Sequence, residues 1–535
     1  MRHLPLRGAL YVTPIALLTL IPLGVVLSAF LSPQTDIWAH LSEYVLPDVL
    51  KNTLTLILGV SVGVLILGVP LAWFTSVCEF PGRKFFSWSL VLPLAMPAYV
   101  LAFVQIGLLD FTGPIQTALR ELIGHFNGFP RIRSTGGVLL VLSLSFYPYV
   151  YLLARNAFLT QGKHALEAAQ ILGLSRQQGF WRVALPMARP WLIAGLTLAL
   201  METLADFGTV SMFNFDTFTT AIYKSWFSLF NLPAALQLAS ILVVFIFILI
   251  SLEQWGRGTK QYQGRIIATD RIQLQGWHRY SATALCSLVL IISFIAPVVQ
   301  LLIWTAKVWY EDFDNRYIGL IIRSVTVSLL AALIVATLAL ILVFIQRRFN
   351  QKSTRWLIRI ATLGYAVPGS VLAIGIFVPV AWLDNVLIPI THTLGFTSYQ
   401  VLKGSIAVML LALVTRFMAV AFQPIDSAMQ RISPNQENAA RSLGLNQPQM
   451  ITRLYTPLLR GGILTAVLMC FVDAMKEMPI TLMTHPFGWN TLAVRVFELT
   501  SEGMWQNAAL PSLMIVLTGL IPVIILVINS EKISL

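Results

Sequence analysis

Long apolar stretches follow one another along nearly the whole chain, with short polar segments between them. Each stretch is long enough to cross roughly 30 Å of hydrocarbon as a helix. We therefore predict an all-α polytopic membrane protein with about twelve transmembrane helices. The predicted spans lie near residues 9–30, 53–76, 86–109, 137–159, 190–212, 235–252, 281–306, 324–345, 357–383, 404–423, 460–484 and 508–529.

The composition supports this interpretation. Hydrophobic residues make up 57% of the chain and charged residues only 11%, and the mean hydropathy is +0.77. A water-soluble protein of 535 residues could not bury that much apolar side chain. Cys78, Cys286 and Cys470 lie far apart in apolar stretches, without the spacing of a metal site or a disulfide framework. We expect them to be buried core residues.

The formal net charge of +13 invites comparison with nucleic-acid-binding proteins, but the placement of the basic residues argues against that class. Lysine and arginine gather in alternate loops, as expected for the cytoplasmic loops of a membrane protein. The chain's partner is thus the lipid bilayer, and no nucleic acid is expected. The basic residues of the predicted cytoplasmic loops are Arg83, Lys84, Lys163, Arg176, Arg182, Arg257, Lys260, Arg265, Arg271, Arg279, Arg347, Arg348, Lys352, Arg355, Arg431, Arg441 and Arg453.

The chain also repeats itself at a distance of 271 residues. A repeat of this length indicates one six-span unit made twice and fused, with the site of action expected between the copies. We predict a first unit at 1–255, a polar cytoplasmic linker at 256–279 and a second unit at 280–535. The matching residues include Leu172, Gly173, Leu174, Arg182, Pro186 and Arg189, which correspond to Leu443, Gly444, Leu445, Arg453, Pro457 and Arg460.

The loop after the fourth span of each unit, near 160–186 and 431–457, has a pattern of its own. Ser175 and Gln178 have the spacing of a capping box that opens a short helix, and Asn446 and Gln449 repeat that spacing. Gly173 and Gly444 suit the left-handed end of the preceding helix. We expect a helix, a sharp turn and a second helix on the cytoplasmic surface.

This loop pair has the features of a docking surface. Small alanines let another protein approach the helix backbone, and an acid near the helix start complements its dipole. The alternative is an elbow packed only on its own bundle, but its occurrence in both copies favours docking. The candidate docking residues are Glu167, Ala168, Ala169 and Gly173 in the first copy and Asn438, Ala439, Ala440 and Gly444 in the second.

The run EAAQILGLSRQQGFWRVALP, from Glu167 to Pro186, resembles the loop by which type I permease subunits of binding-protein-dependent ABC importers engage their ATPases. The resemblance implies two tandem permease units, two copies of an ATPase subunit and a periplasmic or surface-tethered binding protein. The second copy departs from the pattern, with Asn438 in place of the glutamate and Thr456 before Pro457. This difference suggests unequal coupling by the two loops.

The chain contains no Gly-x-x-x-x-Gly-Lys-Ser/Thr phosphate-binding loop. We therefore predict a translocation subunit that is not itself an enzyme and needs no cofactor. ATP hydrolysis is expected on a separate subunit.

Each span after a docking loop carries two acids four residues apart: Glu202 and Asp206, then Asp473 and Glu477. That spacing places both carboxylates on one face of a continuous helix. Acids at membrane depth are costly and often line a transport path, and oxygen ligands suit a hard cation. We predict a role in the pathway, with helix-to-helix attachment, including an acid paired with Lys476, as the alternative.

The amino-acid sequences around these acids resemble those of the permeases of bacterial ferric-iron ABC importers. The resemblance extends over nearly the whole chain and includes the fusion of two units. The resemblance implies Fe(III) as substrate and a multi-pass location in the bacterial inner membrane. Thiamine, phosphonate and oxyanion permeases share the layout and remain alternatives. An ion-coupled secondary transporter or a channel would not need the docking loops.

Overall fold

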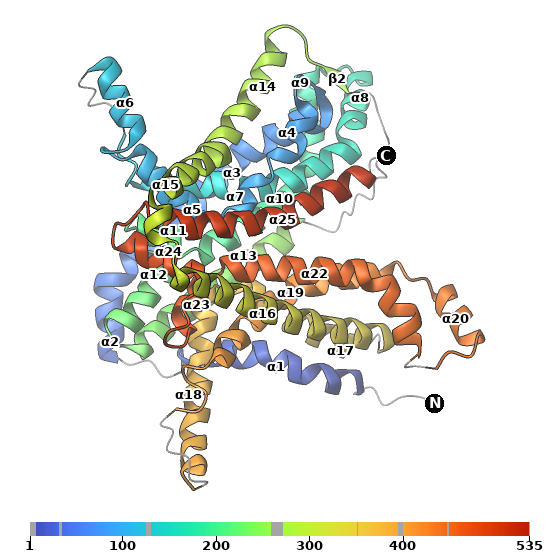
Figure 1. Cartoon of the computed structure of the whole chain (residues 1–535). Helices are drawn as coiled ribbons and strands as arrows, with labels where there is room; N and C mark the ends of the chain where they lie inside the picture. Colours follow the sequence, from blue (N-terminus) through green and yellow to red (C-terminus); the bar gives the residue numbers. More distant parts are fainter. Residues whose placement is uncertain are drawn as a thin grey trace. The chain divides into compact units, whose positions relative to one another are not determined.

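The computed structural model describes residues 7–31, 35–124, 130–257, 271–349, 351–393, 400–446 and 449–533. In this part of the chain the structure is almost entirely helical (Figure 1). Eleven of its helices are long and apolar enough to cross a membrane, and a shorter apolar helix covers Ala509–Ile524. These segments coincide with the twelve predicted spans, although several boundaries differ.

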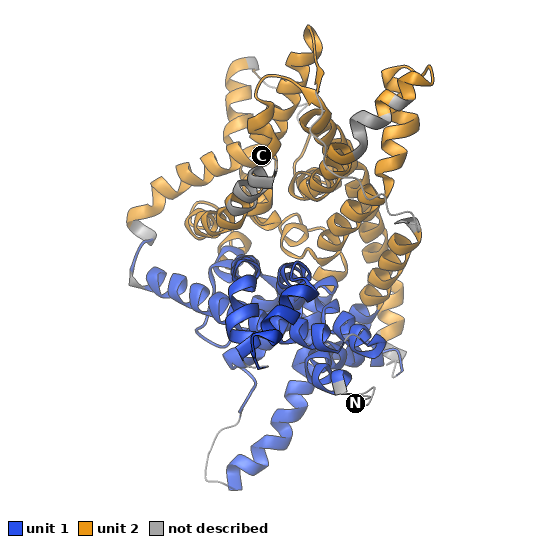
Figure 2. Ribbon diagram, turned by 90° about the vertical axis from the view of Figure 1, so that its right-hand side faces the viewer, with its two compact units in different colours: residues 1–35, 222–240, 311–497 blue, residues 36–221, 241–310, 498–535 orange. Residues whose placement is uncertain are grey.

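The chain forms two compact units, coloured separately in Figure 2. Unit 1 contains residues 1–35, 222–240 and 311–497. Its helices are α1 (Arg7–Ser28), α16 (Asn315–Arg348), α17 (Lys352–Ala361), α18 (Gly369–Thr393), α19 (Ile406–Gln430), α20 (Pro434–Ser442), α22 (Thr456–Lys476) and α23 (Pro479–Thr484), with short helical turns at Lys224–Ser228, Leu363–Ala366 and Met450–Tyr455.

Unit 2 contains residues 36–221, 241–310 and 498–535. Helices α2 (Thr35–His40), α12 (Phe218–Tyr223), α13 (Leu232–Arg257), α15 (Ala296–Asp312) and α24 (Leu492–Ser501) contain residues of both units. The other elements of unit 2 are α3 (Leu46–Val77), β1 (Cys78–Glu79), α4 (Arg83–Ser89), α5 (Ala98–Leu109), α6 (Pro114–Ile123), α7 (Thr135–Ala157), α8 (Lys163–Ile171), α9 (Arg176–Gly179), α10 (Leu185–Ala205), α11 (Gly208–Met212), β2 (Ile272–Gln273), α14 (Trp277–Leu290) and α25 (Ala509–Ile533), with short helical turns at Leu41–Val45, Leu92–Ala95, Phe158–Gly162, Phe180–Ala184 and Ile291–Ile295.

The compact units do not follow the two halves of the sequence. The first helix of the chain, α1, packs against α17 and α18 of the second half. Its Thr19 hydroxyl donates to the Ala361 carbonyl at 3.2 Å, and the Thr415 hydroxyl donates to the Leu18 carbonyl at 3.3 Å. In unit 2, α14 of the second half packs against α4 of the first. Each half thus gives its first helix to a unit built mainly from the other half.

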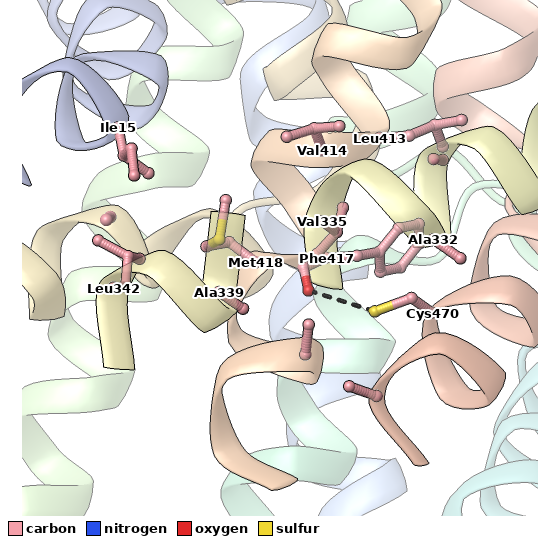
Figure 3. Close-up of a cluster of buried hydrophobic side chains, with 14 of the residues drawn as sticks. Ile15, Ala332, Val335, Ala339, Leu342, Leu413, Val414, Phe417, Met418 and Cys470 are labelled. Carbon is pink, nitrogen blue, oxygen red and sulfur yellow. Dashed lines mark hydrogen bonds between the residues drawn. The ribbon is translucent and has the colours of Figure 1, made fainter. Parts of the chain in front are cut away.

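The core of unit 1 lies where α16, α19 and α22 meet. Small and β-branched side chains such as Ala332, Val335 and Ala339 repeat along the buried face of α16, which lets the neighbouring helices approach closely (Figure 3). Cys470 on α22 belongs to this core, with its sulfur 3.7 Å from the Phe417 carbonyl oxygen. All three cysteines are free and buried, which confirms the sequence prediction.

Two predicted spans begin later than expected. The segment before α5 forms the separate short helix α4 and a tight helical turn at Leu92–Ala95, and α17 with the turn at Leu363–Ala366 repeats this arrangement before α18. Pro97 explains the interruption in the first copy, because Met96 before it has an extended backbone with φ −99° and ψ 121°. The membrane span therefore begins at Ala98 rather than near residue 86.

Candidate functional site

The first patterned loop is a helical hairpin between the end of α7 and the start of α10 (Figure 1). Helix α8 ends at Ile171, Gly173 follows with a left-handed φ of +83°, and the Leu174 N–H donates to the Ala169 carbonyl at 3.0 Å. The next helix opens with the predicted capping box: the Gln178 N–H donates to the Ser175 hydroxyl, and the Ser175 N–H to the Gln178 side chain.

The second loop reproduces this geometry. Gly444 has a φ of +80°, and the Leu445 N–H donates to the Ala440 carbonyl at 3.2 Å. Asn446 and Gln449 exchange the two reciprocal hydrogen bonds of the predicted box, both at 3.0 Å. Helix α20 lies beyond the ends of α19 and α22 (Figure 1). The two loops therefore share one backbone design, as the sequence predicted.

The surfaces of the loops differ from the expectation in one respect. Ala169 and Ala440, proposed as points of close approach for another protein, are buried within their own units. In the first copy, Gly179 packs against Ala169, because a methyl group added there would lie 3.2 Å from the Ala169 Cβ. Glu167, Asn438 and Ala439 are exposed, and the side chain of Ala168 lies outside the described part.

Each loop has an exposed leucine directly before its turning glycine. Leu172 is 80% exposed and its repeat partner Leu443 is 83% exposed. A leucine that is solvent-exposed at the same position in both copies has no packing function within its own unit. The sequence comparison had matched these leucines but had not assigned them a role.

The second loop has an anchor that sequence reasoning missed. The Arg347 guanidinium on α16 lies 2.8 Å from the Glu437 carboxylate on α20 and also donates to the Ile432 carbonyl at 2.8 Å. Glu437 directly precedes Asn438, and it is partly buried. An acid is therefore present in the first turn of α20, where it binds the chain's own arginine, whereas Glu167 lies beyond the first turn of α8, contrary to the expectation of an acid near the helix start.

The two acids of each pair do not share one continuous helix. Helix α10 ends at Ala205 and α22 ends at Lys476, so Asp206 and Glu477 fall in the break before the short helices α11 and α23. The expectation of one helical face is thus wrong for both pairs. The physical reason is that the second acid caps the next helix, and Pro479 cannot continue the helix before it.

The breaks have nearly the same backbone in both copies. Asp206 has φ and ψ of −65° and 130°, and Glu477 has −71° and 112°. The Asp206 carboxylate accepts from the Val210 N–H at 3.1 Å and the Thr209 hydroxyl at 2.9 Å. The Glu477 carboxylate accepts from the Ile480 N–H at 3.3 Å. Both second acids therefore hold the chain in its non-helical turn.

In the second half, both acids also have basic partners. The Glu477 carboxylate lies 3.2 Å from the Arg416 guanidinium of α19, and both side chains are buried. Asp473 pairs with Lys476 at 2.9 Å, which confirms that this lysine neutralises a neighbouring acid. Arg416 was missed, although an arginine within an apolar run is a signal in itself, since such a charge needs a buried partner.

A further buried acid was also missed. Asp384 on α18 is fully buried, and its carboxylate accepts from three successive backbone N–H groups, those of Val401, Leu402 and Lys403, at 2.7–3.1 Å. The three bonds satisfy its charge and fix the segment that leads into α19. Within the described part of the chain, no three His, Cys, Asp or Glu side chains are placed to hold a metal ion together.

Comparison with known sequences identifies the family to which this architecture belongs. The signature of the family described as "Binding-protein-dependent transport system inner membrane component" matches residues 64–255 and again 347–531. The chain belongs to this family. Members are translocation subunits rather than enzymes, so the permease is a multi-pass inner-membrane protein built from two family repeats. Its family implies an ATPase and a substrate-binding protein as partners.

The permease is 27% identical to the Fe(3+)-transport system permease protein FbpB 2 of Haemophilus influenzae over 489 residues, which cover 90% of this chain and 89% of the relative. It is 30% identical over 226 residues to a protein of Haloferax volcanii named "Probable molybdenum ABC transporter permease protein", covering 42% of this chain and 80% of the relative. The molybdenum transport system permease protein ModB of Escherichia coli is 28% identical over 206 residues, covering 37% of this chain and 88% of that protein.

Proposed function

We propose that the permease moves ferric iron from a periplasmic binding protein into the cytoplasm. The observation that carries this proposal is the extent of the match to the Fe(3+)-transport permease, which covers nine-tenths of both chains and both repeats. The molybdenum relatives match less than half of this chain. Dependence on a binding protein also favours this function over an ion-coupled secondary transporter.

The two helical hairpins are the proposed docking sites for two copies of an ATPase subunit. Their support is the shared geometry: a left-handed glycine, a capped second helix and one exposed leucine in each copy. Leu172 and Leu443 can enter an apolar depression on a partner, while Glu167 and Asn438 lie on the exposed side of the same helices. The buried Ala169 and Ala440 then serve to pack each hairpin within its own unit.

The acids at the helix breaks are the proposed gate or lining of the ion path. Irregular backbone at membrane depth is tolerated only where protein buries it or where it lines a cavity, and each break carries an acid that holds its shape. In the second half, Arg416 and Lys476 offset the negative charge. We therefore expect Asp206, whose carboxylate accepts from the Val210 N–H and the Thr209 hydroxyl, to contribute more to cation transport than Glu477, which is paired with Arg416.

The test is uptake of ferric iron by cells or vesicles, normalised to inserted permease, alongside ATP hydrolysis stimulated by the iron-loaded binding protein. Glu202→Gln and Asp206→Asn should lower uptake while stimulated hydrolysis persists. Normal uptake by the double Glu202→Gln, Asp473→Asn variant would show that the first acid of each pair has no role in the pathway. Loss of hydrolysis together with uptake would instead assign them to coupling.

An oxyanion is the second candidate substrate, because the molybdenum permeases match single repeats of this chain. Competition decides between the two: excess molybdate should leave iron uptake unchanged if Fe(III) is the substrate. Molybdate uptake without iron uptake would replace the proposed substrate and leave the class of transporter intact.

A further inference from the structure

Three arginines come together at the ends of three membrane spans of unit 2. Arg83 follows the span that ends at Val77, Arg155 lies in the last turn of α7, and Arg271 precedes the span that begins at Trp277. Burial and the positive charges of Arg83 and Arg155 lower the pKa of Arg271, and Glu79 opposes them. The guanidinium groups of Arg83 and Arg155 therefore both lie close enough to that of Arg271 to repel it.

Backbone contacts hold this arginine cluster in place. Strand β2 pairs in parallel with β1, so that Cys78 lies opposite Ile272 and Glu79 opposite Gln273. The Leu274 N–H donates to the Glu79 carbonyl at 3.2 Å, and the Thr283 hydroxyl to the Pro81 carbonyl at 3.1 Å. The end of the inter-repeat linker is thus fixed beside α4 before any ligand arrives.

The ion pairs of the cluster converge on one carboxylate. Glu79 lies 2.9 Å from Arg83 and 3.8 Å from Arg271. The Arg155 Nε is buried and has no hydrogen-bond acceptor among the described residues. A buried donor without an acceptor is costly. The cluster is therefore ready to receive an external anion with several oxygen atoms.

The surroundings place the cluster at the depth of lipid headgroups. Phe85, Trp277 and Tyr280 are 47%, 79% and 57% exposed on the neighbouring helices α4 and α14. Aromatic side chains of this kind gather where the bilayer meets water. At the repeat positions of Arg83 and Arg155, the second half has Thr354 and Asp426. The second half thus has no arginines equivalent to Arg83 and Arg155.

We propose that Arg155 and Arg271 bind the phosphate of an anionic phospholipid from the cytoplasmic leaflet, with the positive charge of the buried Arg83 beside them. Guanidinium groups bind phosphate oxygens through paired N–H donors, and basic pockets beside membrane helices select anionic headgroups. A bound phosphate bridges the end of the linker and the end of α7, directly before the first docking loop. The site is independent of the transported substrate.

The test uses the full-length permease in nanodiscs that contain phosphatidylcholine with or without phosphatidylglycerol. Phosphatidylglycerol should raise the melting temperature of the native protein, and native mass spectrometry should show it retained. Arg155→Gln and Arg271→Gln should each weaken retention about fivefold, as expected from about 1 kcal/mol per basic residue near an anionic surface. Arg355→Gln is the matched control, because Arg355 is an exposed arginine on α17, the counterpart of α4.

Three outcomes would overturn the proposal: equal stabilisation by phosphatidylcholine, equal lipid retention in all variants, or saturation by inorganic phosphate with no preference for the lipid. Loss of the ATPase subunit from Arg155→Gln and Arg271→Gln with lipid retention intact would assign the cluster to a protein interface instead. Arg83→Lys keeps the charge beside Glu79 and tests the third arginine without removing its ion pair.

Discussion

The ion pair of Arg416 and Glu477 joins α19 to the break that follows α22. Both side chains are buried, and Gly369 allows the Glu477 carboxylate to approach, because a methyl group there would lie 2.5 Å from its oxygen. The first half has Ser145, Asp206 and Ala98 at the corresponding positions. The second half thus replaces a small serine and a shorter acid by a longer pair that needs a glycine for space.

Removal of Arg416 should therefore strongly destabilise the permease. We expect Arg416→Met to lower the free energy of unfolding by roughly 3–5 kcal/mol, because Glu477 keeps its charge without a partner. The double Arg416→Met, Glu477→Met variant should recover part of that loss. Denaturant titration in detergent measures both, and a double variant as unstable as the single one would contradict the argument.

Asp473 and Lys476 provide a milder comparison at the same scale. Their side chains are 24% and 29% exposed, and they lie one helical turn apart. Asp473→Asn should cost no more than about 1 kcal/mol in the same titration. A cost equal to that of Arg416→Met would show that this pair is held as tightly as the buried one.

The docking hairpins are elements whose shape depends on one glycine each. A Cβ added at Gly173 or Gly444 would meet no neighbouring atom within 4 Å, so space does not forbid a side chain there. The constraint is the left-handed backbone alone, which costs most residues roughly 1–2 kcal/mol.

Substitutions at these glycines should consequently follow backbone preference rather than size. Gly173→Val and Gly444→Val should uncouple ATP hydrolysis from transport, whereas Gly173→Asn and Gly444→Asn should retain most coupling, because asparagine tolerates the left-handed region. Gly173→Asp also adds a charge to the turn, so it should impair coupling more than Gly173→Asn does. Equal loss with valine and asparagine would show that the absence of any side chain, not the backbone angle, is required.

The exposed leucines give a second prediction for these elements. Leu172→Ser and Leu443→Ser should each weaken binding of the ATPase subunit without lowering the melting temperature, since both side chains are already in water. Glu167→Ala should impair transport more than Asn438→Ala, because only Glu167 carries charge. Co-purification of the ATPase and uptake together measure these effects, and unchanged co-purification in both leucine variants would remove the docking role.

At the scale of the whole molecule, the exchange of first helices ties the two halves together. Unit 1 contains α1 together with residues 311–497, and unit 2 contains most of the first half together with 241–310. Residues 1–257 or 271–535 expressed alone should fail to accumulate, because each lacks a helix that its main unit requires. Co-expression should restore membrane-inserted permease, as measured by protease resistance. Accumulation of either half alone would contradict this dependence.

The topology is a further property of the whole chain. Both docking loops must face the compartment of the ATPase, so an even number of spans must lie between them. Reporter fusions at Gln178 and Gln449 should both signal the cytoplasm, as should one at Gln261, which lies outside the described residues. A periplasmic signal at any of the three would break the arrangement.

Hydropathy and the repeat of 271 residues determined the fold class, the twelve spans and the position of both hairpins, because these depend on local pattern: apolar length, a capping pair and a glycine after a helix. Only the tertiary structure decided which helices form each compact unit, since that depends on contacts between distant segments such as α1 and α17. It also decided the breaks at Asp206 and Glu477, where capping and proline outweigh the helical spacing of the acids. The role of Arg416 emerged there too, because a buried charge is explained only by the partner that the fold brings to it.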